Sequence, residues 1–200
     1  MKKKFGMFGG SFNPPTNAHI SLALEVAKRF ELDKIIFIPV GNLYNKSELA
    51  DEGHRYNMLK LVCDKHSELE VSDVELNQDK RLYAVDVFDV LKNKYISDEV
   101  YYIIGSDNLA SLPTWKEAEY LIKTYNYIVL ERGDLSAKDI IYGNPILLES
   151  KDNFRILNHV HKNSESSTII REQLKSNRKD ILHIIDNDIY KYIIENDLYQ

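Results

Sequence analysis

The stretch GGSFNPPTNAH, residues 9–19, follows the apolar run FGMF of residues 5–8 and precedes a segment with apolar residues at helical spacing. The run predicts a buried strand, and the spacing predicts a helix over residues 20–30. The quoted stretch is therefore a turn from a strand to a helix. Gly9 and Gly10 leave the backbone open to a ligand, and free N–H groups at a positive helix end favour phosphate.

Two polar side chains separate this turn from an ordinary structural one. Thr16 and His19 are three residues apart, so both can face one side of the first helical turn. Glycines beside a strand also occur in turns that bind nothing. A hydroxyl and an imidazole next to these glycines favour a nucleotide-phosphate site.

Composition limits the class of protein. The chain has 200 residues and a formal charge of −5, which indicates a globular protein and argues against nucleic acid as the main partner. No stretch has the pattern of a signal peptide or a membrane span, so we predict a cytoplasmic protein without a membrane partner. Cys63 is the only cysteine, which excludes an internal disulfide, and its helical spacing with Leu59 and Val62 predicts a buried thiol.

Apolar runs and amphipathic stretches alternate along the chain. This alternation predicts an α/β protein, a Rossmann-like doubly wound parallel sheet, as one domain over residues 1–200 with a C-terminal helical part at 166–200. Gly9 and Gly105 each follow a predicted strand, so both stretches are expected to line one crevice. Further strands are predicted at 35–38, 100–104 and 127–130, and helices at 55–65, 83–92, 116–123 and 189–194.

A second motif, SSTIIR at residues 166–171, lies far along the chain from the first. Ser166, Ser167 and Thr168 can cap a helix while leaving donors for phosphate, and Arg171 adds a planar, permanently charged fork. Alone, the motif is an ordinary helix cap. Together with residues 9–19 it favours a second phosphate contact.

These motifs resemble those of a known family. The first stretch is similar to the (His/Thr)-x-Gly-His signature of the nucleotidyltransferase superfamily, and Ser-Ser-Thr-x-Ile-Arg resembles the closing motif of bacterial nicotinate mononucleotide adenylyltransferases. GSDNLASLPTW at 105–115 is similar to that family's Gly-x-Asp segment followed by a tryptophan. NKSELADEGHRYNML at 45–59 and YKYIIENDLY at 190–199 resemble further family segments. The resemblance spans nearly the whole chain.

The resemblance implies transfer of an adenylyl group from ATP to nicotinate mononucleotide, giving nicotinate adenine dinucleotide and pyrophosphate. The chemistry of this transfer predicts Mg²⁺ with ATP, held mostly by substrate oxygens and water, and we assign no residue as a metal ligand. The resemblance also implies catalytic roles for Thr16, His19, Lys46 and Arg171. The implied ATP contacts are Gly9, Gly10, Ser11, Phe12, His19, Gly105, Asp107, Ser166, Ser167, Thr168 and Arg171. The implied mononucleotide contacts are Ser11, Phe12, Asn13, Lys46, Tyr83, Ala84, Trp115 and Arg132.

Several positions depart from the family pattern and keep alternatives open. Ala18 replaces a glycine, Tyr44 and Asn45 replace a Pro-His pair before Lys46, and Ala84 replaces a threonine in the predicted pyridine pocket. Nicotinamide mononucleotide therefore stays open as an acceptor, and Ala18 and Ala84 keep open a nucleotide-binding sensor without turnover. Phosphopantetheine is an alternative acceptor within the same superfamily, although Trp115 and Arg171 speak against it. A homo-oligomer is also left open.

Other polar groups are interpreted as surface features. His159 and His161 lie two apart without a third metal ligand nearby in sequence, so a solvated pair is favoured. Asp73, Glu75 and Asp79 lack calcium-loop spacing and predict a polar surface connection.

Overall fold

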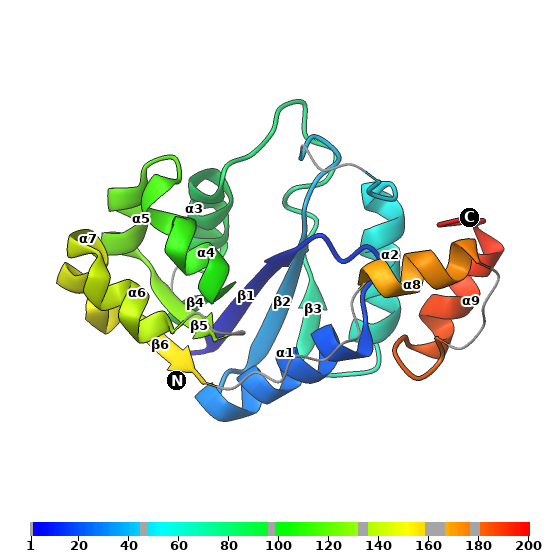
Figure 1. The fold of residues 1–200 in the computed structure, drawn as a ribbon, viewed down its shortest axis with the longest axis horizontal. Coiled ribbons are helices and arrows are strands. Elements are labelled where there is room, and N and C mark those ends of the chain that lie inside the picture. Colours follow the sequence, from blue (N-terminus) through cyan, green and yellow to red (C-terminus); the bar gives the residue numbers. More distant parts are fainter. Residues whose placement is uncertain (1, 45–47, 96–98, 132–135, 159–166, 177–180) are drawn as a thin grey trace.

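Six parallel strands run through the centre of the molecule in the computed structural model, which describes residues 2–44, 48–95, 99–131, 136–158, 167–176 and 181–200 (Figure 1). The order across the sheet is β3-β2-β1-β4-β5-β6. The chain thus extends the sheet to one side of β1 first and then returns to build the other side from β4. The strands are β1 Lys4–Gly10, β2 Lys34–Pro39, β3 Leu69–Val71, β4 Glu99–Gly105, β5 Asn126–Leu130 and β6 Phe154–Leu157.

Helices cover both faces of the sheet (Figure 1). One face carries α1 Asn17–Phe30 and α2 Glu52–Cys63, and α8 Ser167–Lys175 and α9 Asn187–Glu195 lie beside α2 and belong to the same core cluster. The other carries α3 Ala84–Lys94, α4 Ser106–Ser111, α5 Ala118–Thr124, α6 Ala137–Gly143 and α7 Pro145–Glu149, with the 3-10 turns η1 Leu112–Thr114 and η2 Lys151–Asn153 in the same part of the chain. The predicted doubly wound α/β fold is confirmed.

Side chains of the central strands point alternately to the two faces of the sheet and so divide the core into two layers. Phe8 and Phe37, paired between β1 and β2, pack with the α1 side, whereas Met7 and Ile36, paired one residue earlier, pack with the α3 side. Successive side chains of a strand point to opposite faces, so both faces of these strands are apolar. Such continuous apolar runs are what made the central strands predictable.

The predicted elements are present, with shifted ends. β1 continues through Gly9 and Gly10, so the glycines are the last residues of the strand. The helix predicted from residue 116 begins at Ala118, because Glu117 adopts a left-handed conformation with φ of 56°. Cys63 is buried as predicted, and burial raises the pKa of its thiol to about 12.

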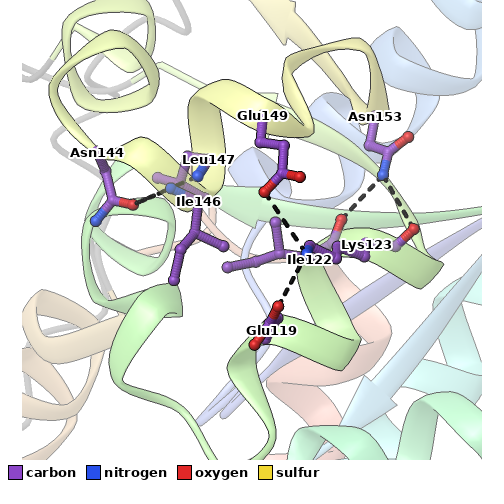
Figure 2. A network of polar contacts seen from close by, with 8 residues as sticks. All are labelled: Glu119, Ile122, Lys123, Asn144, Ile146, Leu147, Glu149 and Asn153. Atoms are coloured by element: carbon purple, nitrogen blue, oxygen red, sulfur yellow. Dashed lines mark hydrogen bonds and ion pairs between the residues drawn. The ribbon is translucent and has the colours of Figure 1, made fainter.

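Polar contacts attach the far edge of the sheet to the helices beside it (Figure 2). Asn153 Nδ2, just before β6, donates to the Ile122 carbonyl of α5 at 2.9 Å. Lys123 Nζ lies 2.8 Å from Glu119 Oε1 and 3.6 Å from Glu149 Oε2, which connects α5 to α7. Because these ion pairs are exposed, the buried apolar contacts contribute more to stability.

The C-terminal helices are fixed to α2. His54 Nδ1 and Tyr192 Oη are 2.9 Å apart, and Lys65 Nζ lies 2.7 Å from Asp186 Oδ1. Ile170 of α8 is fully buried in the core on the α1 side. In the described ranges, no helix has the length and apolar character needed to cross a membrane.

Candidate active site

The two predicted glycine-bearing strand ends lie side by side. β1 and β4 are parallel neighbours, and the strand order reverses between them. Helices on opposite faces diverge at such a point and leave a crevice at the carboxyl ends of the strands. This topology brings the two strand ends together, and residues on both sides of Gly105 line the cleft described below, although Gly105 itself does not.

The two glycines at the end of β1 differ in the space around their Cα atoms. A Cβ added at Gly9 would meet nothing within 4 Å, so its backbone faces open space. A Cβ added at Gly10 would lie 2.9 Å from the Phe12 ring, which leaves no room for a side chain there. The backbone at Gly9 can therefore be approached closely by a ligand.

Phe12 belongs to the core rather than to a ligand surface. Its side chain is 3% exposed, and its ring centroid lies 5.3 Å from those of both Phe37 and His19. Its φ of 45° is a left-handed conformation that bulky residues avoid. Packing of the ring holds this conformation, so only the Phe12 backbone remains for the predicted nucleotide contacts.

Thr16 and His19 form a capping box at the start of α1. The Thr16 N–H donates to His19 Nδ1 at 3.0 Å, and Thr16 Oγ1 lies 2.9 Å from the same nitrogen. A backbone N–H can only donate, so Nδ1 is the acceptor and the neutral ring carries its proton on Nε2. Thr16 is 1% exposed, so its hydroxyl orients His19 and does not itself face solvent.

The Asn13 side chain forms hydrogen bonds with three residues that are distant in sequence. Nδ2 donates to the Glu48 carbonyl at 2.8 Å, and Oδ1 accepts from the Ala50 N–H at 2.9 Å and from the Tyr199 hydroxyl at 2.8 Å. At 4% exposure, these contacts occupy Oδ1 and one of the two Nδ2–H donors, and the mononucleotide contact that the resemblance implies stays a prediction. Asn13 is a structural residue of the turn.

Arg55 is buried completely and holds three loop segments together. Its guanidinium donates to the carbonyls of Ala50 at 2.8 Å, Ser11 at 3.0 Å and Val40 at 2.6 Å. Burial lowers the pKa of the group, although nearby Glu52 and other acids oppose that effect. The residues after β1 and β2 are thereby fixed to the start of α2.

The closing motif contacts the glycine turn directly. Ser167 Oγ donates to the Pro14 carbonyl at 2.8 Å, and Arg171 Nη1 donates to the Asn13 carbonyl at 2.8 Å. Arg171 Nη2 also lies 3.4 Å from Thr168 Oγ1. The two motifs, predicted separately, therefore form one structure. The predicted contacts Lys46, Arg132 and Ser166 lie outside the described residues, as do His159 and His161.

A cleft of about 800 Å³ opens at the ends of β1, β2 and β4. Of the predicted contacts, it is lined by Gly9, Gly10, Ser11, Tyr83, Ala84 and Trp115. Thr16, His19, Gly105, Asp107 and the α8 residues stand outside its described lining. Phe88 and Tyr102 also line it, and their rings stack with centroids 3.4 Å apart. The cleft thus joins the glycine turn to the predicted pyridine pocket.

The segment after β4 presents its aspartate and tryptophan differently. Gly105 precedes α4, and the Asp107 side chain packs so closely on it that a Cβ would not fit. Asp107 is exposed at the start of the helix. Trp115 is half-buried, and its Nε1–H donates to Ser111 Oγ at 3.1 Å.

Sequence reasoning missed three charged residues that line the cleft: Glu75, Arg81 and Lys116. The polar connection predicted at Asp73, Glu75 and Asp79 is a loop in which Asp73 and Asp79 are exposed and Glu75 is half-buried. Burial raises the pKa of the Glu75 carboxyl to about 7, and Oε2 accepts from the Gly41 N–H at 3.4 Å. Arg81 and Lys116 lie next to the predicted contacts Tyr83 and Trp115 in sequence. That adjacency was the signal that could have identified them.

Comparison with known proteins defines the class. Residues 7–173 match the family model described as cytidylyltransferase-like. A solved structure of Plasmodium falciparum nicotinic acid mononucleotide adenylyltransferase complexed with NaAD superposes with a TM-score of 0.79 at 24% identity, covering 98% of this chain and 97% of that one. The match of the family model over residues 7–173 places the chain among the cytidylyltransferase-like proteins, and the solved structure agrees in fold.

More similar sequences narrow the class. A probable nicotinate-nucleotide adenylyltransferase of Carboxydothermus hydrogenoformans is 34% identical over 98% of both chains. The nicotinate-nucleotide adenylyltransferase of Bacillus subtilis is 32% identical over 99% of both. The chain belongs to the nicotinate-nucleotide adenylyltransferase family.

Proposed function

We propose that this chain transfers the adenylyl group of ATP to nicotinate mononucleotide, giving nicotinate adenine dinucleotide and pyrophosphate. The contact of Ser167 and Arg171 with the Pro14 and Asn13 carbonyls carries the proposal, because it places donors of two motifs around one turn. The names of the relatives, and the Plasmodium structures complexed with NaAD and with APC, point to the same reaction.

The reaction we propose is a direct displacement. A 5'-phosphate oxygen of the mononucleotide attacks the α-phosphorus of ATP, the bond from that phosphorus to the bridging oxygen breaks, and pyrophosphate leaves with the electron pair. Positioned donors and cations suffice for this step, and no protein nucleophile takes part. His19 Nε2–H and the backbone at Gly9 would bind the reacting phosphate, with Thr16 orienting His19. Arg171 would bind the leaving phosphates.

Mg²⁺ would enter with ATP, held largely by phosphate oxygens and water. Bound there, the ion would offset charge on the transferring phosphates. Small-molecule substrates fit the cleft, whereas a homo-oligomer and a cytoplasmic location stay predictions of the sequence.

The direct test supplies ATP and Mg²⁺ with nicotinate mononucleotide, nicotinamide mononucleotide or phosphopantetheine in turn and follows pyrophosphate release. We expect release with a pyridine mononucleotide. Release with phosphopantetheine alone would replace the proposed acceptor, and no release with any acceptor would leave nucleotide binding without turnover. Ala18, the feature that favours such a sensor, lies in an ordinary first turn of α1, where alanine is well tolerated.

His19→Ala tests the role of the imidazole. We expect the rate to fall about a hundredfold, since removing one transition-state donor costs roughly 3 kcal/mol. His66→Ala, which changes a histidine beyond the end of α2, is the matched control. A loss under about tenfold for His19→Ala, with an unchanged unfolding midpoint, contradicts the role.

A further inference from the structure

Two loops that line the cleft are both hydrogen-bonded to one carboxylate, that of Glu52. The first loop, residues 40–44, follows β2, and the second, residues 72–83, connects β3 to α3, so that the two lie side by side at the carboxyl ends of the strands (Figure 1). The cleft lining includes Val40 and Tyr44 of the first loop and Glu75, Arg81, Leu82 and Tyr83 of the second. The shape of the cleft therefore depends on how these two loops stand relative to each other.

Glu52 lies in the first turn of α2 and is 9% exposed. Its Oε2 accepts from the Asn42 N–H of the first loop, and its Oε1 accepts from the Asn77 N–H of the second at 2.7 Å. The Glu52 N–H in turn donates to Asn42 Oδ1 at 2.9 Å. Hydrogen bonds to an ionised carboxylate are stronger than those between neutral groups. Each oxygen of this buried carboxylate therefore holds a different loop.

The backbone near both bonds is suited to this arrangement. Asn77 has a φ of 54°, a left-handed conformation that asparagine tolerates better than most residues. A Cβ added at Gly41 would lie 2.4 Å from the Glu75 carbonyl oxygen, so the two backbones approach each other closely there. The hydrogen bond from the Gly41 N–H to Glu75 Oε2 is long, at 3.4 Å. Glu52 therefore makes the shorter carboxylate contacts to the two loops.

Side-chain packing between the loops is incomplete. A cavity of about 190 Å³ lies between them, lined by Glu52 and by residues of both loops, among them Asn42, Tyr44 and Gln78. Side chains that face a cavity lack contacts on that side. The hydrogen bonds of Glu52 therefore contribute more than packing to the distance between the loops.

We propose that Glu52 is a positioning residue for adenylyl transfer, which sets the separation of the two loops and with it the fit of the mononucleotide. The inference rests on the proposed function. Glu52 is absent from the described lining of the cleft, so it acts through the backbone of Asn42 and Asn77. The glycine turn, where ATP phosphate is expected, belongs to β1 and α1 and makes no described hydrogen bond with the Glu52 carboxylate.

The test measures kcat and both KM values in Glu52→Ala. We expect KM for nicotinate mononucleotide to rise about tenfold and kcat and KM for ATP to change less than about threefold, because two charge-assisted hydrogen bonds are lost at loops that face one substrate. Glu52→Gln keeps one oxygen acceptor and should have an intermediate KM, and it serves as the test if Glu52→Ala does not fold. Glu25→Ala, which removes an exposed carboxylate from α1, is the matched control.

Amide hydrogen exchange measures the loops without turnover. We expect the Asn42 and Asn77 amides to exchange about tenfold faster in Glu52→Ala, and one of them to do so in Glu52→Gln, while exchange in β1 stays unchanged. A fall in kcat with unchanged KM values would indicate loss of folded protein and overturn the positioning role, as would unchanged exchange at both amides. If the wild type releases no pyrophosphate with any acceptor, the proposed function fails, and hydrogen exchange with calorimetric binding of nicotinate mononucleotide still decides the role of Glu52.

Discussion

Replacing Arg55 with methionine should destabilise the whole protein, although the residue touches no ligand. The substitution removes three donors from the Ala50, Ser11 and Val40 carbonyls inside a fully buried site. Hydrogen bonds to a charged group contribute about 1.5–3 kcal/mol each, and water can satisfy part of what is lost. We therefore expect the free energy of unfolding to fall by about 3–5 kcal/mol, a large part of a typical total.

Urea unfolding followed by circular dichroism measures this change. At a slope of about 2 kcal/mol per molar, the expected loss moves the midpoint by roughly 1.5–2.5 M. Arg55→Lys keeps the charge without the planar fork and should also be destabilised, because an ammonium cannot serve the carbonyls in that geometry. Arg29→Met, at the exposed end of α1, should stay within about 0.5 kcal/mol. A loss below about 1 kcal/mol for Arg55→Met would refute the reasoning.

Three further predictions concern the site and its supports. Trp115→Ala should raise KM for the mononucleotide about tenfold and KM for ATP much less, since stacking contributes about 1–3 kcal/mol; equal changes would contradict ring stacking. Tyr199→Phe should lower the free energy of unfolding by about 1 kcal/mol through the lost bond to Asn13 Oδ1, with exposed Tyr142→Phe as control. Glu75 has a folded pKa of about 7 against an ordinary 4.5, so its protonated form stabilises the fold. The contribution of Glu75 to the free energy of unfolding is fully present below about pH 4.5 and is lost as the pH rises through about 7. The loss is at most about 3 kcal/mol. Glu75→Gln should flatten that slope in urea unfolding at several pH values.

Strands that are long and apolar on both faces could be read from the sequence, and short ones could not. β1, β2, β4 and β5 carry continuous apolar runs because helices cover both of their faces. β3 has three residues and β6 has four, and Arg155 in β6 is exposed. Such short segments acquire their conformation from pairing with β2 and β5, which no local pattern contains.

The candidate site was predictable where backbone carries the function. Gly9 and Gly10 are residue types that a strand-to-helix turn requires. Thr16 and His19 are predicted from their spacing to face a phosphate, and the capping box that they form was not predicted. The burial of Asn13 was not predictable, because its partners come from Glu48, Ala50 and Tyr199, distant in sequence. Contacts of that kind depend on packing between segments.

The turn at residues 13–14 accepts hydrogen bonds from Ser167, Arg171 and Tyr199, which are among the last residues of the chain to be synthesised, so we expect the turn to be completed late. A nascent chain that has released only β1 to β6 from the ribosome holds the glycine turn without its cover. Nucleotide binding should therefore develop late in translation, and prematurely terminated products should neither retain ATP nor compete for it. For the same reason, an affinity tag on recombinant protein is better placed ahead of β1 than behind Tyr199.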